Sequence, residues 1–357
     1  MLRPLFIFLG LVGVALLIFG AFRQGAVKPY GTLLPATSVV SGVSAAALES
    51  GAGAGGPISP LPRSLDLDPR RVEVGELLFN DRRLSGDNSV SCRDCHNLET
   101  GGVDRRVRSP GAGGNTSPLN TTTVFNVGLL PRLLWSGRFE SLEAQLEALL
   151  TSSPLLDTGW EEILGKLRAD AELVEAFRGA FHGEGPTERT VLAALSLYQR
   201  SLLTPNSPFD RYLRGEESAL SPAAFAGYRK FSSFGCISCH QGMHVGANLF
   251  QRFGVIRNYH SDEQIASPDF PEAYFGLYAA TGNEDDRFMF RVSGLRNVAE
   301  TPPYFHDGSA ETLEEAVRTM ATYQLGRALG DEDVGDIVAF LESLTGEAPG
   351  AGAPVAR

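Results

Sequence analysis

Two copies of the pattern Cys-x-x-Cys-His constrain this chain more than any other feature of its sequence. The first copy is CRDCH at 92–96 and the second is CISCH at 236–240. The 357-residue chain has 4 cysteines, all of them inside these two copies, so none remains for a disulfide elsewhere. The residues that the pattern singles out are Cys92, Cys95, His96, Cys236, Cys239 and His240.

The spacing within each copy is typical of covalent haem attachment. Two thiols one helical turn apart can form thioethers to both vinyl groups of one haem, and the histidine that follows is then held against the iron. A zinc site would need its ligands gathered in one tetrahedral cluster, and it gives no reason for a histidine directly after each cysteine pair. We therefore predict two c-type haems, with His96 and His240 as axial ligands of the irons.

The N-terminus carries an uninterrupted apolar run, LFIFLGLVGVALLIFGAF at 5–22, between Arg3 and Arg23. As a helix this run is about 27 Å long, close to the thickness of a bilayer core. Phe19 and Phe22 surround the only small residues near its end, which makes a poor signal-peptidase site. We predict an uncleaved anchor in the inner membrane and export of the rest to the periplasm, which agrees with c-type haem; the alternative is a soluble periplasmic protein after cleavage.

The remaining chain reads as a linker followed by helices. Gly, Ala, Ser and Pro dominate the stretch that ends at Arg63, which lacks the apolar periodicity of a packed segment. The segments 140–150, 187–203 and 312–325 place apolar residues at three- and four-residue intervals, as amphipathic helices do. A Gly-xxx-Phe helix end precedes both cysteine pairs, which suggests a duplication.

We predict a mainly α fold with two cytochrome c-like haem domains in tandem, preceded by a membrane helix and a flexible linker. The predicted parts are an anchor at 1–23, a linker at 24–63, an N-terminal haem domain at 64–212, a C-terminal haem domain at 213–347 and a disordered tail at 348–357. The formal net charge of −11 and the lack of a basic run argue against a nucleic-acid partner.

Beyond the haem motifs, three longer stretches carry a resemblance to a known family. They are LWSGRFESLEAQ at 134–145, LLTPNSPFDRYLRGE at 202–216 and VSGLRNVAETPPYFHDGSAETLEEAV at 292–317. With the two CxxCH copies, they resemble the bacterial di-haem cytochrome c peroxidases, whose family includes the enzymes that mature methylamine dehydrogenase. The resemblance covers 64–347. It implies that peroxide reacts at the N-terminal haem and that electrons enter at a high-potential C-terminal haem.

The resemblance implies a methionine as the second ligand of the C-terminal haem, and a thioether ligand raises the haem potential. Met243 is too close in sequence to His240 to reach the opposite haem face easily, and Met289 sits in the core-like stretch RFMFRV. The resemblance places the family's ligand fourteen residues after the histidine of YFHDG, here His306, and that position is Met320.

The resemblance also implies roles for residues between and beside the haems. Trp135 matches the tryptophan that the family places between its haems, and Gln145 matches the family's distal glutamine. The family binds a calcium ion between its domains, which by position implies Asn120, Thr301 and Pro303 as ligands.

The chain departs from the peroxidase pattern at two positions. Ala112 stands where the family has a loop histidine that ligates the N-terminal haem until activation, and no histidine occurs between His96 and His182. We therefore predict an open or water-filled sixth position. Leu155 stands where the family has the glutamate that moves a proton during peroxide cleavage.

Three consequences of the missing glutamate stay open: two replacement acids and a loss of activity. Asp157 is the nearest acid, Glu147 is a more distant one that acts through water, and the third outcome is poor peroxide turnover. Of the other histidines, we expect His182, His244 and His260 on the surface or in loops, with His244 the alternative haem ligand to check. We expect His306 near the second haem without ligating it.

Three functions compete on these grounds. The first is reduction of hydrogen peroxide to water with electrons from a small cytochrome c or cupredoxin. The second is an open-haem oxidase of a protein or organic substrate, against which Met320 counts, because such relatives usually have tyrosine there. The third is a membrane-tethered electron carrier. Gln145 and Trp135 favour an enzyme, whereas Leu155 favours the carrier. The resemblance also suggests a homodimer.

Overall fold

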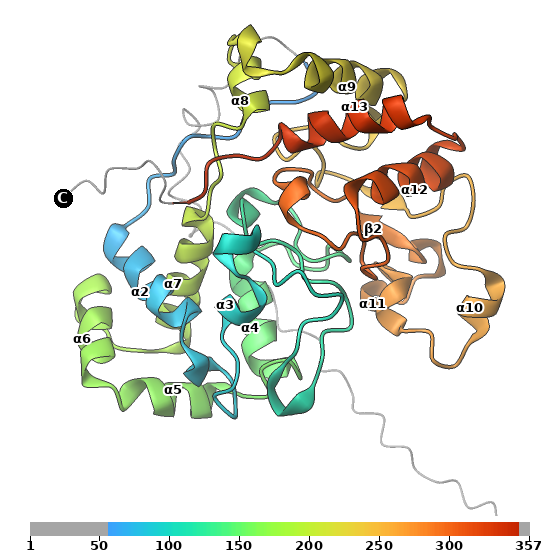
Figure 1. Ribbon diagram of the computed structural model, residues 1–357. Coiled ribbons are helices and arrows are strands. Elements are labelled where there is room, and N and C mark those ends of the chain that lie inside the picture. The colour runs from blue at the N-terminus through green and yellow to red at the C-terminus, as the bar shows by residue number, and fades with distance from the viewer. Residues whose placement is uncertain (1–55, 350–357) are drawn as a thin grey trace, which may run out of the picture. The chain divides into compact units, whose positions relative to one another are not determined.

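The computed structural model describes residues 56–349 (Figure 1). The predicted anchor at 1–23, residues 24–55 of the predicted linker and the tail from 350 lie outside the described residues. Every helix within 56–349 is too short or too polar to cross a bilayer.

Helices carry most of the regular structure, so the predicted mainly α fold is confirmed. The helices are α2 Pro69–Phe79, α3 Cys92–Cys95, α4 Leu142–Ser152, α5 Trp160–Arg168, α6 Ala171–Ala180, α7 Glu188–Ser201, α8 Pro208–Leu213, α9 Pro222–Ser233, α10 Asp262–Ala266, α11 Tyr278–Thr281, α12 Leu313–Leu325 and α13 Asp331–Glu342. The strands β1 Phe250–Arg252 and β2 Met289–Arg291 form one antiparallel pair, with Gln251 opposite Phe290.

The three helices predicted from periodicity begin at capping residues. The side chain of Ser141 accepts a hydrogen bond from the Ala144 N–H at the start of α4. Thr187 before α7 and Thr312 before α12 each form a capping box with the third helical residue. Such caps satisfy the N–H groups that a helix start leaves unpaired, so α4, α7 and α12 begin where the sequence predicts.

The described residues pack into two main hydrophobic clusters. The first lies around α2 and α7 and includes Leu78 and Leu195, and the second lies around α9 and α13 and includes Phe231 and Phe340. Figure 1 shows α2 beside α7 and α9 beside α13. The predicted division at 212 and 213 stays a prediction.

The repeated Gly-xxx-Phe has the same packing role in both clusters. A Cβ on Gly75 would lie 2.1 Å from the Ala194 carbonyl oxygen of α7. A Cβ on Gly227 would lie 1.8 Å from the Asp336 carbonyl oxygen of α13. Each glycine therefore permits a close helix crossing just before a haem motif. The phenylalanine four residues later is buried in each case.

Two segments pack differently from the expectation. Ile58 and Leu61, assigned to the flexible linker, are buried in the second cluster. Phe209 of α8, assigned to the N-terminal haem domain, is buried in the same cluster. The linker prediction is wrong for residues 56–63, because a Pro- and Gly-rich composition does not reveal two isolated apolar side chains that fill a distant core.

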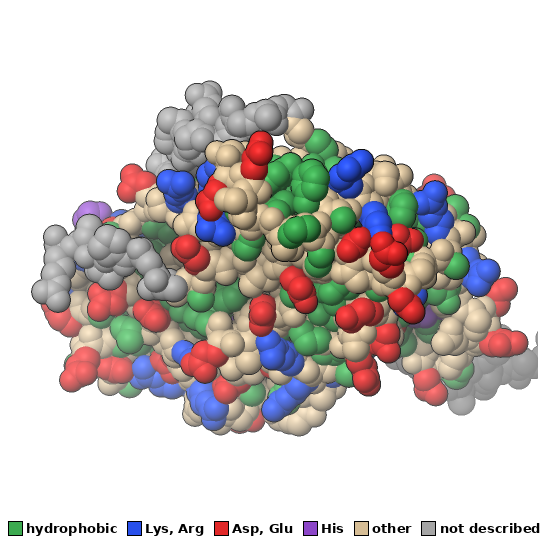
Figure 2. Space-filling model, turned by 45° about the horizontal axis from the view of Figure 1, so that its top comes forward, with side chains coloured by type: hydrophobic (Ala, Val, Ile, Leu, Met, Phe, Trp, Pro, Cys, Tyr) green, Lys and Arg blue, Asp and Glu red, His purple; other side chains and the backbone are tan. Residues whose placement is uncertain are grey.

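On the face shown in Figure 2, acidic and basic side chains are interspersed. Despite the net charge of −11, this face therefore carries no continuous patch of a single charge.

Candidate haem sites and the residues between them

The first haem motif forms the short helix α3. The Asp94 carboxylate accepts hydrogen bonds from the Ser91 N–H at 2.7 Å and the Ser91 hydroxyl at 2.9 Å, which holds the start of this turn. Nδ1 of His96 lies 3.3 Å from the Gly102 carbonyl oxygen. With the proton on Nδ1, as this contact requires, Nε2 is the ring nitrogen that can bind iron.

The second motif holds its histidine in the same way. Nδ1 of His240 lies 3.1 Å from the Ser293 carbonyl oxygen. Gly246 lies against this contact, since a Cβ there would be 2.3 Å from the Ser293 oxygen and 3.2 Å from Nδ1. Burial lowers the pKa of His240 to about 4 and also lowers the pKa of His96, so both imidazoles are neutral near pH 7. Neutral imidazole is the form that binds a metal, and all four thiols are free.

The buried side chain of Arg291 indicates whether the fold can accommodate the carboxylate of a haem. Its side chain is 6% exposed, and its Nε donates to the Leu134 carbonyl oxygen at 3.0 Å. Burial lowers its pKa to about 10, with no carboxylate of residues 56–349 contributing to the shift. A buried guanidinium without a counter-ion is costly. A haem propionate would supply the missing charge, so the chemistry of Arg291 is compatible with a bound haem.

Trp135 connects the two halves of the described chain. Its Nε1 donates to the Asn120 carbonyl oxygen at 2.8 Å, and its own carbonyl accepts from the Arg291 N–H at 3.0 Å. Its ring lies edge-on to the His306 ring, with centroids 6.3 Å apart. These contacts agree with a position between two haems, which stays a prediction.

The residues implied for calcium lie near this junction. The Asn120 N–H donates to the His306 carbonyl oxygen at 2.9 Å, and its Nδ2 donates to the Arg106 carbonyl oxygen at 2.9 Å. Thr301 and Pro303 are half-buried on the chain that leads to His306. The structure brings the segments together, and the calcium site itself stays a prediction.

The two positions that depart from the family pattern lie next to one another. The N–H of Ala112 donates to the Leu155 carbonyl oxygen at 2.8 Å. Ala112 is buried in the first cluster, whereas Leu155 is half-buried. Gln145 on α4 has a buried Oε1 with no hydrogen-bond partner among the described residues.

The two acids considered as replacements differ in availability. Glu147 accepts a hydrogen bond from Trp160 Nε1 at 2.9 Å, so its carboxylate is already engaged by the indole ring. Asp157 is exposed and follows Leu155 by two residues, with a positive φ of 45°. Asp157 is the more accessible of the two for proton exchange with solvent.

The structure corrects two histidine predictions. His244 and His260 lie in loops but are buried, each 7% exposed, and neither Nε2 has a hydrogen-bond partner among the described residues. His182 is exposed, as predicted. His306 is 2% exposed and packs against aromatic rings rather than against the surface. The loop around His260 is covered by aromatic side chains, among them Phe270 and Tyr274, which loop composition alone does not reveal.

The three candidate methionines lie in different parts of the second half of the described chain. Met320 lies on α12 and is half-buried, and Met289 belongs to β2. The carbonyl oxygen of Met243 accepts from Arg296 Nε at 3.0 Å, which ties its backbone to the second cluster. Ligation by Met320 stays a prediction.

Comparison with known proteins decides the family. The profile of the family described as di-haem cytochrome c peroxidase matches residues 69–218. The cytochrome c551 peroxidase of Nitrosomonas europaea is 36% identical over 294 residues, which cover 82% of this chain and 85% of that protein. This chain belongs to the di-haem cytochrome c peroxidase family. Membership implies two c-type haems, in agreement with the two motifs.

Other proteins are also similar to this chain in sequence or in structure. The cytochrome c peroxidase Ccp of Escherichia coli is 39% identical over 81% of this chain, which spans only 61% of that relative. The methylamine utilization protein MauG of Methylorubrum extorquens is 31% identical over 81% of this chain and 82% of that protein. A crystal structure of a MauG-like protein associated with microbial copper homeostasis superposes with a TM-score of 0.68 at 29% identity, covering 79% of this chain and 91% of that one.

Proposed function

We propose that this chain reduces hydrogen peroxide to water with electrons from a small c-type cytochrome or cupredoxin. The electrons enter at the haem held by His240 and Met320, and peroxide reacts at the haem held by His96. The observation that carries the proposal is the buried, unpartnered Oε1 of Gln145. An electron carrier has no use for such a group, whereas a pocket that orients peroxide needs a fixed hydrogen-bonding amide.

The chain's own residues supply positioning and proton handling. The bound haem supplies the iron and the electrons that cleave the oxygen–oxygen bond. His96 and His240 are oriented by backbone carbonyls, so neither imidazole can rotate freely. The Oε1 of Gln145 can accept a hydrogen bond from peroxide. Leu155 leaves no acid at the position of the family's glutamate, so proton delivery falls to Asp157, an exposed acid two residues away, and we expect it to be slow.

Steady-state turnover tests the function. Purified protein with both haems is mixed with hydrogen peroxide and a reduced small cytochrome. Two equivalents of donor are oxidised per peroxide, since two electrons and two protons convert one peroxide into two waters. Gln145→Leu is expected to slow this reaction while leaving both haem spectra intact. Donor oxidation no faster than in the absence of protein contradicts the proposal and favours an electron carrier.

The N-terminal haem is expected to bind exogenous ligands without prior reduction. Ala112 is buried and its N–H is bonded to Leu155, so this loop offers no side chain that can ligate iron. Cyanide added to the fully oxidised protein is therefore expected to bind promptly, and prior half-reduction should not accelerate binding. Stopped-flow spectra measure this. A low-spin N-terminal haem that binds cyanide only after reduction contradicts an open site.

Met320→His is expected to lower the potential of the C-terminal haem by a substantial part of the roughly 0.8 V range that axial ligands span. A second imidazole favours ferric iron more than a thioether does. Redox titration followed in the visible spectrum measures the shift, and Met289→Leu is the matched control. An unchanged potential assigns the ligand elsewhere.

We also propose that the chain works in the periplasm, held at the inner membrane by residues 1–23, because c-type haem and an apolar N-terminal run occur together. Retention of the full-length chain in a washed membrane fraction tests this. A calcium ion near Asn120 and a homodimer complete the proposal.

A further inference from the structure

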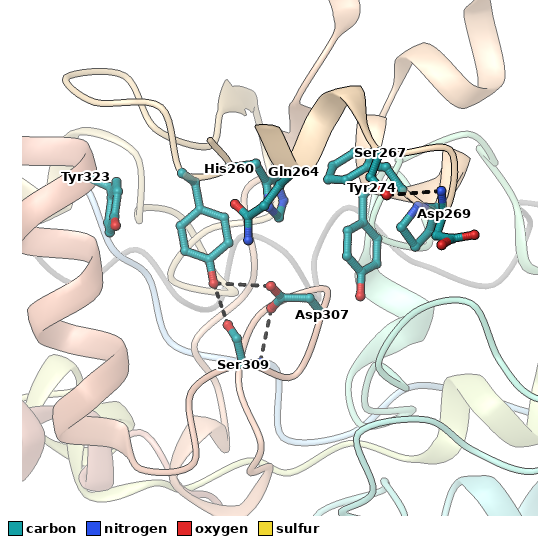
Figure 3. A pocket seen from close by; sticks show the side chains of 11 residues that line it. His260, Gln264, Ser267, Asp269, Tyr274, Asp307, Ser309 and Tyr323 are labelled. Carbon is teal, nitrogen blue, oxygen red and sulfur yellow. Dashed lines mark hydrogen bonds between the residues drawn. The ribbon is translucent and has the colours of Figure 1, made fainter. Parts of the chain in front are cut away.

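A cavity of about 500 Å³ lies between the chain around α10 and the loop that follows His306 (Figure 3). Its walls carry aromatic and polar side chains from segments far apart in sequence. The ones used below are Tyr259, His260, Tyr274, Asp307 and Ser309. Figure 3 shows that His260 and Asp307 line this cavity from two separate segments of the chain.

Three metal-binding side chains converge at one edge of the cavity. Ligand atoms of His260, His306 and Asp307 all lie within 4.8 Å of one another. The two imidazoles are 7% and 2% exposed. The Nε2 atoms of His260 and His306 are both buried without a hydrogen-bond partner among the described residues. Two unpaired ring nitrogens and a carboxylate therefore point to one volume.

The surrounding rings hold both imidazoles in place. The Tyr274 ring stacks on His260 with centroids 5.6 Å apart and an interplanar angle of 18°. The Phe290 ring lies over His306 with centroids 4.5 Å apart. A buried ring nitrogen that is fixed but unpaired is unfavourable unless another group satisfies it. In contrast, the ring nitrogens of His96 and His240 already have backbone partners.

The carboxylate of Asp307 is also oriented. Its Oδ1 accepts from the Ser309 N–H at 3.1 Å, and its Oδ2 accepts from the Tyr259 hydroxyl at 3.2 Å. Partners of this kind orient a metal-binding carboxylate. Arg108, a nearby cation, donates a hydrogen bond to the backbone carbonyl oxygen of Asp307 at 3.2 Å and not to its carboxylate.

We propose that His260, His306 and Asp307 bind one divalent transition-metal ion of the zinc or copper type, with the remaining position open to the cavity. Two imidazoles and one carboxylate are a ligand set that such ions use. Burial lowers the pKa of both histidines, that of His306 to about 4, so both are neutral near pH 7 and no proton needs to leave.

The site is separate from the haem ligands in sequence and does not depend on peroxide reduction. It ties Tyr259 and His260 to the loop that carries His306. The His306 ring also lies edge-on to Trp135, with centroids 6.3 Å apart. A bound ion would therefore lock the chain next to the tryptophan that is placed between the haems.

Titration of the protein with both haems bound tests the proposal. The protein is treated with a chelator, supplied with excess calcium to fill oxygen-rich sites, and titrated with Zn²⁺ by calorimetry. One tight equivalent is expected for the unaltered chain and for His182→Ala, the exposed-histidine control. His260→Ala and Asp307→Asn should lose it. Tyr259→Phe should weaken it by roughly 10–100-fold, because it removes a partner of the carboxylate.

A second readout keeps the test independent of folding failures. Cu²⁺ bound to the unaltered chain is expected to show nitrogen coupling in its paramagnetic resonance spectrum, and His260→Ala should reduce that coupling. Haem spectra report whether each variant folds, and Tyr259→Phe, which keeps all three ligands, is the mildest change. Equal stoichiometry and affinity in the unaltered chain, His260→Ala and Asp307→Asn would overturn the proposal, as would the absence of any tight equivalent.

Discussion

Leu155→Glu is expected to raise peroxide turnover by on the order of 10²-fold or more, toward the roughly 10²–10⁴-fold that one general acid–base group contributes. Leu155 matches the position of the family's glutamate, and its carbonyl oxygen accepts from the N–H of buried Ala112. The side chain is half-buried, so a carboxyl group there can be reached by solvent protons. Steady-state donor oxidation measures the change.

Leu155→Gln is the matched control, because it has the size and polarity of the glutamate variant but cannot carry a proton. It is expected to leave turnover near the level of the unaltered chain. Cyanide binding should be similar in all three proteins, since ligand binding needs no proton transfer within the site. Equal stimulation by Gln and Glu would mean that polarity, and not proton transfer, is what Leu155 lacks. No stimulation by either would mean that Asp157 or another acid already serves the reaction.

Asp210→Ala is expected to destabilise the fold by about 3–5 kcal/mol, the usual cost of breaking a buried ion pair by removing one partner. Arg296 and Asp210 are 2.8 Å apart, with side chains that are 2% and 0% exposed. The carboxylate also accepts from the Leu61 N–H at 3.1 Å. Removing it leaves a buried guanidinium and an unpaired N–H. Denaturant unfolding of the protein with both haems measures the loss.

Glu140→Ala is the matched control for this pair. Glu140 also binds an arginine, Arg132, at 2.6 Å, but the two side chains are 70% and 42% exposed. Solvent screens such a pair, so its loss is expected to change the unfolding midpoint little. A midpoint for Asp210→Ala as high as that of Glu140→Ala would mean that the remaining hydrogen bonds of Arg296, to Met243, Ser207 and Ser59, compensate for the lost carboxylate.

Several features of the fold follow from local pattern. The helices α4, α7 and α12 start at capping residues followed by apolar periodicity, and both signals lie within a few neighbouring residues. The Gly-xxx-Phe repeat also marks real close crossings, at Gly75 and Gly227. In contrast, the packing of Ile58 into the second cluster is not visible locally, because its partners lie more than a hundred residues away.

The candidate site divides in the same way. The haem-attachment residues could be predicted because thioether chemistry requires a contiguous spacing. The lack of a loop histidine is also visible in the sequence, since no histidine lies between His96 and His182, whereas the open sixth position stays a prediction. The burial of His244 and His260 could not, because neighbouring residues in the sequence do not signal it; the ring of His260, for example, lies against that of Phe270.

The sequence by itself determined two covalent haem sites, a helical chain and an apolar N-terminal run, because each depends on residues that are adjacent or one turn apart. Only the tertiary structure decided which distant groups meet: Arg296 with Asp210, Ala112 with Leu155, and His260 with His306. The physical reason is that a lone histidine or arginine carries no local mark of its partner. Its burial and charge state are set by side chains that long-range packing brings around it.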